Sequence, residues 1–140
     1  MKYVTRNENE TCEAARAFAK TVQAPLVICL TGDLGAGKSV FSRAMIRALC
    51  GDDTLTVPSP TFTLLQMYEC DTAPIYHFDL YRLDDPEDVL ALGWDDAMDE
   101  GISLIEWPDK AGGYLPSDCI HIIISIEDAQ TRTITIKDTP

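Results

Sequence analysis

The sequence contains no long apolar run and few basic residues. No window approaches the roughly 18 apolar residues that a membrane-spanning helix needs, and residues 1–18 contain no apolar core typical of a secretion signal. We therefore expect an unexported, cytoplasmic protein that does not contact a membrane. Only 11 Lys and Arg accompany 23 Asp and Glu, so the formal net charge is −12. Because a phosphate backbone is bound by clustered cations, this chain alone is not expected to bind nucleic acid.

Metal-binding and redox patterns are also missing. The five cysteines include no C-x-x-C pair, and His77 and His121 have no cysteine or carboxylate at the spacing of a zinc site. We predict no zinc and interpret both histidines as core or surface residues. The odd number and wide spacing of the cysteines, mostly within apolar stretches, favour buried thiols in a reducing cytosol.

The chain does contain enough apolar residues for one core. Its 140 residues are 46% hydrophobic, which is typical of a single domain, here expected to span residues 1–140. Apolar residues recur at helical spacing after Thr11, an expected N-cap, and a continuous apolar run at 26–30 predicts a strand buried on both faces. A second amphipathic helix follows the next glycines and is expected to end at Gly51.

Strand patterns dominate the second half of the chain. Pro58 and Pro60 exclude a helix interior and predict an ordered loop. Together the elements predict an α/β fold, a three-layer sandwich whose sheet is parallel near the glycines and antiparallel elsewhere. The elements predicted after the loop are a strand at 61–70, an adjacent antiparallel strand at 73–83, a helix at 84–93 capped by Asp84 or Asp85 and ended by Gly93, a strand at 102–107, and a hairpin of 119–127 with 131–138.

The glycines after the first predicted strand form a phosphate-binding pattern. Residues 32–39 read GDLGAGKS and match G-x-x-x-x-G-K-[ST] between a buried strand and a helix. Glycines let backbone N–H groups turn inward, and the helix adds its positive N-terminal end. Lys38 would span the β- and γ-phosphates, and the Ser39 hydroxyl suits Mg²⁺. A P-loop NTPase-like domain is therefore favoured over a plain glycine-rich turn, with nucleotide contacts expected from Gly32, Leu34, Gly35, Ala36, Gly37, Lys38, Ser39 and Val40.

Two carboxylates are candidates for chemistry beside this loop. Glu106 ends an apolar strand, where a Walker-B-like carboxylate would reach Mg²⁺; the alternative is a surface carboxylate at a strand end. Asp79 lies inside an otherwise apolar strand and needs a partner. It would orient the attacking water or bind Mg²⁺ through water, and an equal alternative is a buried pair with Arg82 or a hydroxyl.

Two further residues have open interpretations. Thr61, in the loop constrained by prolines, would sense the γ-phosphate as switch-loop threonines do, or would only stabilise a turn. Trp107 would lie near the phosphates because it follows Glu106, or would simply pack in the core.

Four motifs, GDLGAGKS, SPTFTL, HFDLYRL and LIEWP, occur in this order. Together they resemble the small bacterial P-loop ATPase required for tRNA threonylcarbamoyladenosine biosynthesis, the TsaE family, over about Thr11 to Pro116. The resemblance implies binding of ATP and Mg²⁺, and work with the partner proteins that transfer a threonylcarbamoyl group to the adenosine next to the anticodon. It also implies slow ATP hydrolysis that drives or resets the partner assembly. An acidic protein that acts through protein partners need not bind tRNA alone.

The resemblance also assigns roles to individual positions. The family commonly has two threonines after the lysine, whereas here Ser39 is followed by Val40, so a weaker hold on the α-phosphate is expected. The positions implied are Lys38, Thr61, Asp79 and Glu106 in catalysis, Ser39 and Glu106 at Mg²⁺, residues 35–38 at the phosphates, and Glu8 and Trp107 at the nucleotide.

Other classes of P-loop protein are alternatives. A small-molecule kinase shares the glycine pattern but usually needs an arginine-rich lid, and of the six arginines only Arg43 and Arg47 are close in sequence. A GTPase is disfavoured, because residues 109–112 match D-x-x-G but no N-K-x-D pattern follows. A nucleotide-gated assembly module with incidental hydrolysis stays open, since it requires the same phosphate and Mg²⁺ ligands.

Overall fold

A seven-stranded mixed sheet forms the centre of the computed structural model, which describes residues 1–138. Its strand order is β1-β7-β6-β2-β5-β4-β3. The neighbours β6, β2, β5 and β4 are parallel to one another, whereas β1, β7 and β3 pair antiparallel with their neighbours, which confirms the mixed sheet. The strands are β1 (Lys2–Thr5), β2 (Leu26–Thr31), β3 (Leu65–Glu69), β4 (Pro74–Asp79), β5 (Ile102–Glu106), β6 (Ile120–Ile126) and β7 (Arg132–Asp138).

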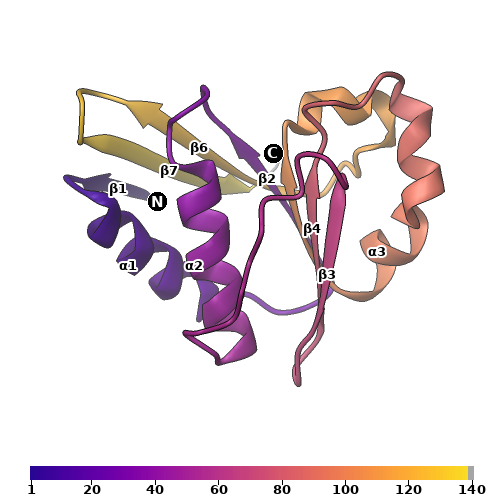
Figure 1. The fold of residues 1–140 in the computed structure, drawn as a ribbon, viewed down its shortest axis with the longest axis horizontal. Helices are drawn as coiled ribbons and strands as arrows, with labels where there is room; N and C mark the ends of the chain where they lie inside the picture. The colour runs from indigo at the N-terminus through magenta and orange to yellow at the C-terminus, as the bar shows by residue number, and fades with distance from the viewer. Residues whose placement is uncertain (139–140) are drawn as a thin grey trace.

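Helices cover both faces of this sheet, which confirms the three-layer α/β architecture (Figure 1). Two separate buried apolar clusters mark the two interfaces: Phe41 and Met45 of α2 belong to one, and Trp94 of α3 belongs to the other. No helix within residues 1–138 is long and apolar enough to cross a bilayer. The helices are α1 (Glu8–Ala19) and α2 (Lys38–Cys50) on one face, and the 3₁₀ segments η1 (Pro86–Leu92) and η2 (Pro108–Tyr114) with α3 (Trp94–Glu100) on the other.

Strand β2 is buried on both faces, as its continuous apolar run predicts. Ile28 and Leu30 pack under α1 and α2, while Val27 and Cys29 pack in the opposite layer. Burial, with a smaller contribution from the neighbouring Cys119, raises the pKa of the Cys29 thiol to about 12. This thiol therefore stays protonated and acts as a core residue, as expected from its apolar surroundings.

The first helix begins earlier than the sequence prediction. Its N-cap is Asn7, whose side chain accepts a hydrogen bond of 2.9 Å from the backbone N–H of Glu10. Thr11, the predicted cap, lies inside α1, where its buried hydroxyl is 2.9 Å from that of Thr5. Both residue types are good caps, but Asn7 has acidic residues in the turn that follows it, and the carboxylate of Glu10 accepts a hydrogen bond of 2.9 Å from the backbone N–H of Arg6. This local pattern favours Asn7 over Thr11.

Three other expectations are corrected by the structure. The segment before Gly93 is the 3₁₀ segment η1, with Asp85 as its N-cap, rather than an α-helix. The helical structure does not end at Gly93, because α3 starts directly after it. Strand β1 has no counterpart in the predicted elements. Cys50 and Cys70 form a disulfide, with Cα atoms 4.9 Å apart, because the end of α2 meets the end of β3. The expectation of buried thiols is therefore wrong at these two positions.

The close approach of β4 to the start of β5 yields a test of this packing. A Cβ at Gly101 would lie 2.9 Å from Cε2 of Tyr76 and would also collide with the carbonyl oxygen of Pro74. Gly101→Ala should lower the free energy of unfolding in urea by about 2 kcal/mol, because the backbone cannot yield without strain. Gly113→Ala, where no atom lies within 4 Å of the new methyl group, is the control and should leave stability unchanged or slightly raised. Equal effects of the two changes would contradict the packing.

Candidate functional site

A cavity of about 740 Å³ lies at the carboxyl ends of the parallel strands. Strand register explains its position, because Leu30 of β2 and Asp79 of β4 both pair with Glu106 of β5. In parallel sheets, ligands commonly bind at this edge, and the volume suits a small molecule. The cavity brings together nearly all of the residues predicted to act: Glu8, Leu34, Gly35, Ala36, Gly37, Lys38, Ser39, Val40, Thr61, Asp79, Glu106 and Trp107. Gly32 is the exception: it does not line the cavity, although its carbonyl oxygen accepts a hydrogen bond from Lys38.

The glycine loop adopts a conformation that depends on its glycines. Gly35 and Gly37 have φ angles of 82° and 106°, in the left-handed region that favours glycine. Gly37 is also the N-cap of α2, so the N-terminus of this helix points its unpaired N–H groups toward the cavity. A Cβ at Gly32 would lie 2.7 Å from the carbonyl oxygen of Ile124, which explains why the first position of the loop also needs glycine.

Lys38 is the buried cation of the cavity, with 6% of its surface exposed. Its Nζ donates a hydrogen bond of 2.6 Å to the carbonyl oxygen of Gly32 and lies 3.6 Å from the centroid of the Trp107 ring. Burial lowers the pKa of the Lys38 ammonium, while the carboxylates of Glu106 and Asp79 oppose this change. The ammonium is therefore held against the loop by one hydrogen bond and one cation–π contact.

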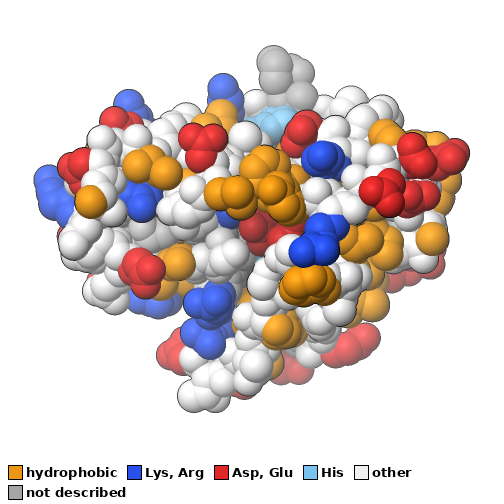
Figure 2. Space-filling view, turned by 45° about the horizontal axis from the view of Figure 1, so that its top comes forward, with side chains coloured by type: hydrophobic (Ala, Val, Ile, Leu, Met, Phe, Trp, Pro, Cys, Tyr) orange, Lys and Arg blue, Asp and Glu red, His pale blue; other side chains and the backbone are white. Residues whose placement is uncertain are grey.

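Trp107 lies at the mouth of the cavity rather than in the core alone. Its ring contacts Lys38 and stands 5.0 Å from the ring of Tyr81, measured between centroids. Large apolar side chains are exposed nearby: Leu34 is 67% exposed and Phe62 is 78% exposed. Figure 2 shows hydrophobic side chains gathered near the middle of one face of the molecule, beside acidic ones. The site therefore has an apolar rim around a polar floor.

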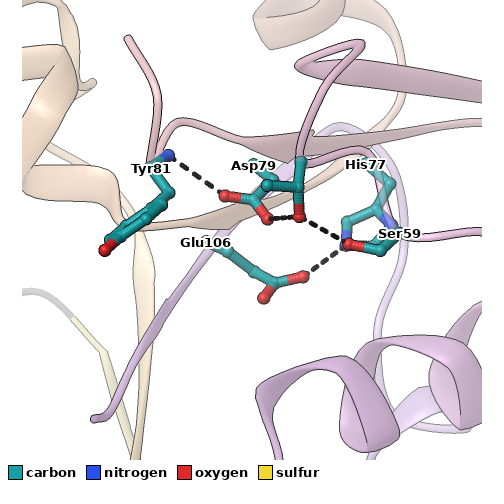
Figure 3. Close-up of polar contacts among 6 residues, drawn as sticks. Ser59, His77, Asp79, Tyr81 and Glu106 are labelled. Atoms are coloured by element: carbon teal, nitrogen blue, oxygen red, sulfur yellow. Dashed lines mark hydrogen bonds and ion pairs between the residues drawn. The ribbon is translucent and has the colours of Figure 1, made fainter. Parts of the chain in front are cut away.

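Asp79 connects the proline-constrained loop to β4 (Figure 3). Its two carboxylate oxygens accept hydrogen bonds of 3.0 Å from the hydroxyl of Thr61 and the backbone N–H of Tyr81. Thr61 and Ser59 are joined by a further hydroxyl contact of 2.8 Å. The predicted hydroxyl partner of Asp79 is thus present, whereas Arg82 stacks 4.2 Å from the centroid of the Phe62 ring instead.

Glu106 is a buried carboxylate with a histidine partner. Oε2 of Glu106 lies 2.7 Å from Nε2 of His77, and both side chains are 3% exposed. The alternative of a surface carboxylate is therefore wrong for Glu106, and His77 is a core residue that also contacts the site (Figure 3). The contact could not be predicted from the sequence around His77, because the pairing of β4 with β5 brings together two residues that are 29 positions apart.

Arg132 is a site residue that the sequence analysis missed. From β7 its guanidinium donates hydrogen bonds of 3.1 Å and 3.3 Å to the carbonyl oxygens of Ala36 and Gly35. It lines the same cavity as the glycine loop. Because 96 residues separate Arg132 from Ala36, no local motif marks this contact.

The residues of the cavity fit a nucleotide with Mg²⁺. No group of three or more His, Cys, Asp or Glu side chains is arranged as a metal site within residues 1–138. In nucleotide sites, however, Mg²⁺ takes most of its ligands from phosphates and water, and needs one or two protein oxygens. Ser39 and Glu106 both line the cavity, and only one Glu106 oxygen is used by His77. These two residues would hold the ion.

Comparisons with known proteins agree with these features. The family model described as threonylcarbamoyl adenosine biosynthesis protein TsaE matches residues 5–134. Relatives described as tRNA threonylcarbamoyladenosine biosynthesis protein TsaE include one from Rickettsia bellii, 39% identical over 96% of this chain and 93% of its own. One from Bacillus subtilis is 35% identical over 96% and 84% of the two chains. The crystal structure of Bacillus subtilis YdiB has a TM-score of 0.82 at 28% identity, covering 100% of this chain and 86% of that one.

The buried pair of His77 and Glu106 yields a stability test. His77→Leu should lower the free energy of unfolding by about 3 kcal/mol, because it leaves a buried carboxylate without its partner. Combining His77→Leu with Glu106→Leu should cost less than the sum of the single changes, as a double-mutant cycle in urea would measure. His121→Leu, at the other histidine, is the control and should have a small effect. Additive losses would show that the pair does not interact.

Proposed function

This chain belongs to the TsaE family of threonylcarbamoyladenosine biosynthesis proteins, and we propose that it binds and hydrolyses ATP with Mg²⁺ in support of that tRNA modification. One observation carries the proposal: a P-loop ending in Lys38 shares a cavity with Thr61, Asp79 and Glu106. These are the parts that phosphoryl transfer requires, namely a phosphate cradle, a cation, a metal ligand and a group that positions water. We further propose a single domain that works in the cytoplasm.

The glycine loop would bind the phosphates through its backbone. Residues 35–37 and the N-terminus of α2 offer N–H groups, and Arg132 holds the loop from its carbonyl side. Val40 lines the cavity but has no hydroxyl, so the α-phosphate would be held by backbone groups there. Glu8, at the start of α1, lies on the cavity wall where it would contact the rest of the nucleotide.

Lys38 would exchange partners when ATP binds. Its ammonium now donates to Gly32 and lies over Trp107, and the phosphates would offer it oxygens of opposite charge in place of a carbonyl. Charge on the transferred phosphoryl group would then be stabilised by Lys38 in a buried environment, where electrostatic interactions are strong. Ser39 and Glu106 would hold Mg²⁺, which would supply positive charge against the phosphates.

Asp79 and Thr61 would act together at the γ-phosphate. The Thr61 hydroxyl donates to Asp79, so a phosphate that accepts from Thr61 would release one oxygen of Asp79. That oxygen would then be able to orient the attacking water. This exchange would also move the loop that carries Ser59 and Thr61, which supplies a switch between nucleotide states.

Protein partners would bind beside this site and respond to the nucleotide bound there. Leu34 and Tyr81 line the cavity and are exposed, and Phe62, next to the lining residue Thr61, is exposed as well. The acidic chain is poorly suited to bind tRNA directly. We propose that the partners are the proteins that transfer the threonylcarbamoyl group. A nucleotide-gated assembly module with incidental hydrolysis is the second candidate, favoured by the Thr61–Asp79 contact, which links loop position to the site.

Nucleotide binding depends on Lys38 if the proposal is correct. Lys38→Ala should weaken Mg²⁺–ATP binding by at least about tenfold, roughly 1.4 kcal/mol, because the buried cation of the cavity is lost. Calorimetric titration of the purified proteins measures this change. Lys110→Ala, which removes an exposed lysine outside the cavity, is the control and should bind ATP like the wild type. Absence of ATP binding by the wild type, alone and with the partner proteins, would overturn the proposal.

Turnover separates an ATPase from a gating module. Asp79→Ala should bind ATP but lose most of its ATP hydrolysis, since the group that orients water is removed. Hydrolysis is measured for the wild type, Asp79→Ala and Lys38→Ala, each alone and mixed with the threonylcarbamoyl-transferring complex. An ATPase should show turnover that rises with partners and falls in both variants. Background turnover in every mixture, with threonylcarbamoyl transfer retained by Asp79→Ala, would favour the gating module.

A further inference from the structure

Three of the six arginines converge on the outer surface formed by α1 and α2. Arg16 of α1 and Arg43 and Arg47 of α2 line one small cavity of about 130 Å³, together with Cys12 and Asp53. This cavity shares no residue with the candidate nucleotide site. A wider groove continues from it past Lys20, and Arg16 and Arg47 line both. The function proposed above uses none of these side chains.

The three guanidinium groups form no ion pair within the described residues, although the charge of Arg47 interacts with the carboxylate of Asp52. Among residues 1–138 no carboxylate lies within ion-pair distance of any of them, although the chain carries 23 acidic residues. Arg47 donates its Nε to the carbonyl oxygen of Leu55 at 2.8 Å, which fixes this side chain but leaves its terminal amino groups without a hydrogen bond in the described part of the chain. Arg16 and Arg43 make no hydrogen bond there either. Among the described residues, Asp53 is the only acidic residue that lines the small cavity, while Glu13 and Asp53 line the adjoining groove.

This arrangement carries an electrostatic cost. Arg43 and Arg47 are four residues apart on α2, and like charges at this spacing destabilise a helix by about 0.2–0.5 kcal/mol per pair. Lys20, the C-cap of α1, adds a further positive charge four residues after Arg16. In a chain with net charge −12, acidic residues would be the expected neighbours of such cations. The cluster therefore forms a local positive patch that an anion would relieve.

We propose that Arg16, Arg43 and Arg47 form a binding site for a phosphate group, separate from the nucleotide site. Guanidinium groups match the oxygens of phosphate with paired N–H donors, which makes arginine well suited to this ligand. The small cavity has room for one tetrahedral anion. The adjoining groove, with Lys20 along it, allows that phosphate to belong to a longer chain such as RNA, or to be a free phosphate compound.

The test is a residue-resolved titration of the full chain. Inorganic phosphate is added to the ¹⁵N-labelled protein at low salt, and amide shifts of residues 12–16 and 43–47 are followed by NMR. The wild type should show saturable shifts there. Arg16→Gln combined with Arg43→Gln should weaken this binding by at least about tenfold, because charge-assisted hydrogen bonds are lost. Arg6→Gln combined with Lys110→Gln removes the same charge outside the small cavity and should change the affinity less than twofold.

Further variants keep this site distinct from the nucleotide site. Lys38→Ala should retain the phosphate shifts of residues 12–16 and 43–47, and the double arginine variant should bind Mg²⁺–ATP like the wild type. Failure of ATP binding in the wild type would therefore not affect this inference. Arg43→Lys keeps the charge but loses the paired donors, and it should bind phosphate several-fold more weakly than the wild type.

The source of the phosphate is identified by a second titration. If short single-stranded RNA shifts the same amides and is weakened by the same arginine variants, the site binds a nucleic-acid backbone. If phosphate binds there and RNA does not, the site binds a free phosphate compound. No saturable shift with phosphate, or shifts with polyglutamate but not with phosphate, would overturn the inference.

Discussion

The parallel pairing of β2, β5 and β4 is the constraint on which the site depends. In this register Leu30, Glu106 and Asp79 stand side by side, so the chain leaves three strands at one edge of the sheet. The P-loop follows the first of these strands, and the metal and water-positioning candidates end the other two. Burial of these strands on both faces fixes their register. A one-residue slip of β4 or β5 would turn its carboxylate to the other face of the sheet, away from the loop.

Local patterns predicted most of the elements and most of the cavity lining, whereas β1, α3 and the long-range contacts needed the structure. The glycine loop and the end of α2 at Gly51 follow from residue types within a few positions. The His77–Glu106 pair and the bonds from Arg132 to the P-loop join residues 29 and 96 or more positions apart. The disulfide between Cys50 and Cys70 likewise depends on where α2 and β3 end in space. Residue spacing within a single sequence does not predict these long-range contacts.

The distribution of charge explains how an acidic chain can hold anions. The candidate nucleotide site relies on backbone N–H groups, a helix terminus and Lys38, which is the single buried cation among residues 1–138, so it needs little of the total basic charge. Long-range repulsion from the surface carboxylates is screened by salt beyond about 10 Å, while these short contacts are not. The arginine cluster on α1 and α2 is built differently, from side chains alone. Local geometry, rather than net charge, decides where an anion is stable on this protein.

Trp107 stands at the mouth of the site with φ 56° and ψ 53°, a left-handed conformation that a tryptophan adopts at a cost of about 1 kcal/mol or more. Glycine would adopt it freely, but would remove the ring that lies over Lys38. The ring also packs at the edge of the buried cluster of Phe78 and Trp94 and stands against Tyr81, so the contacts of the indole offset the backbone strain. Trp107 therefore combines a strained backbone with a side chain that fixes the position of the buried Lys38 ammonium.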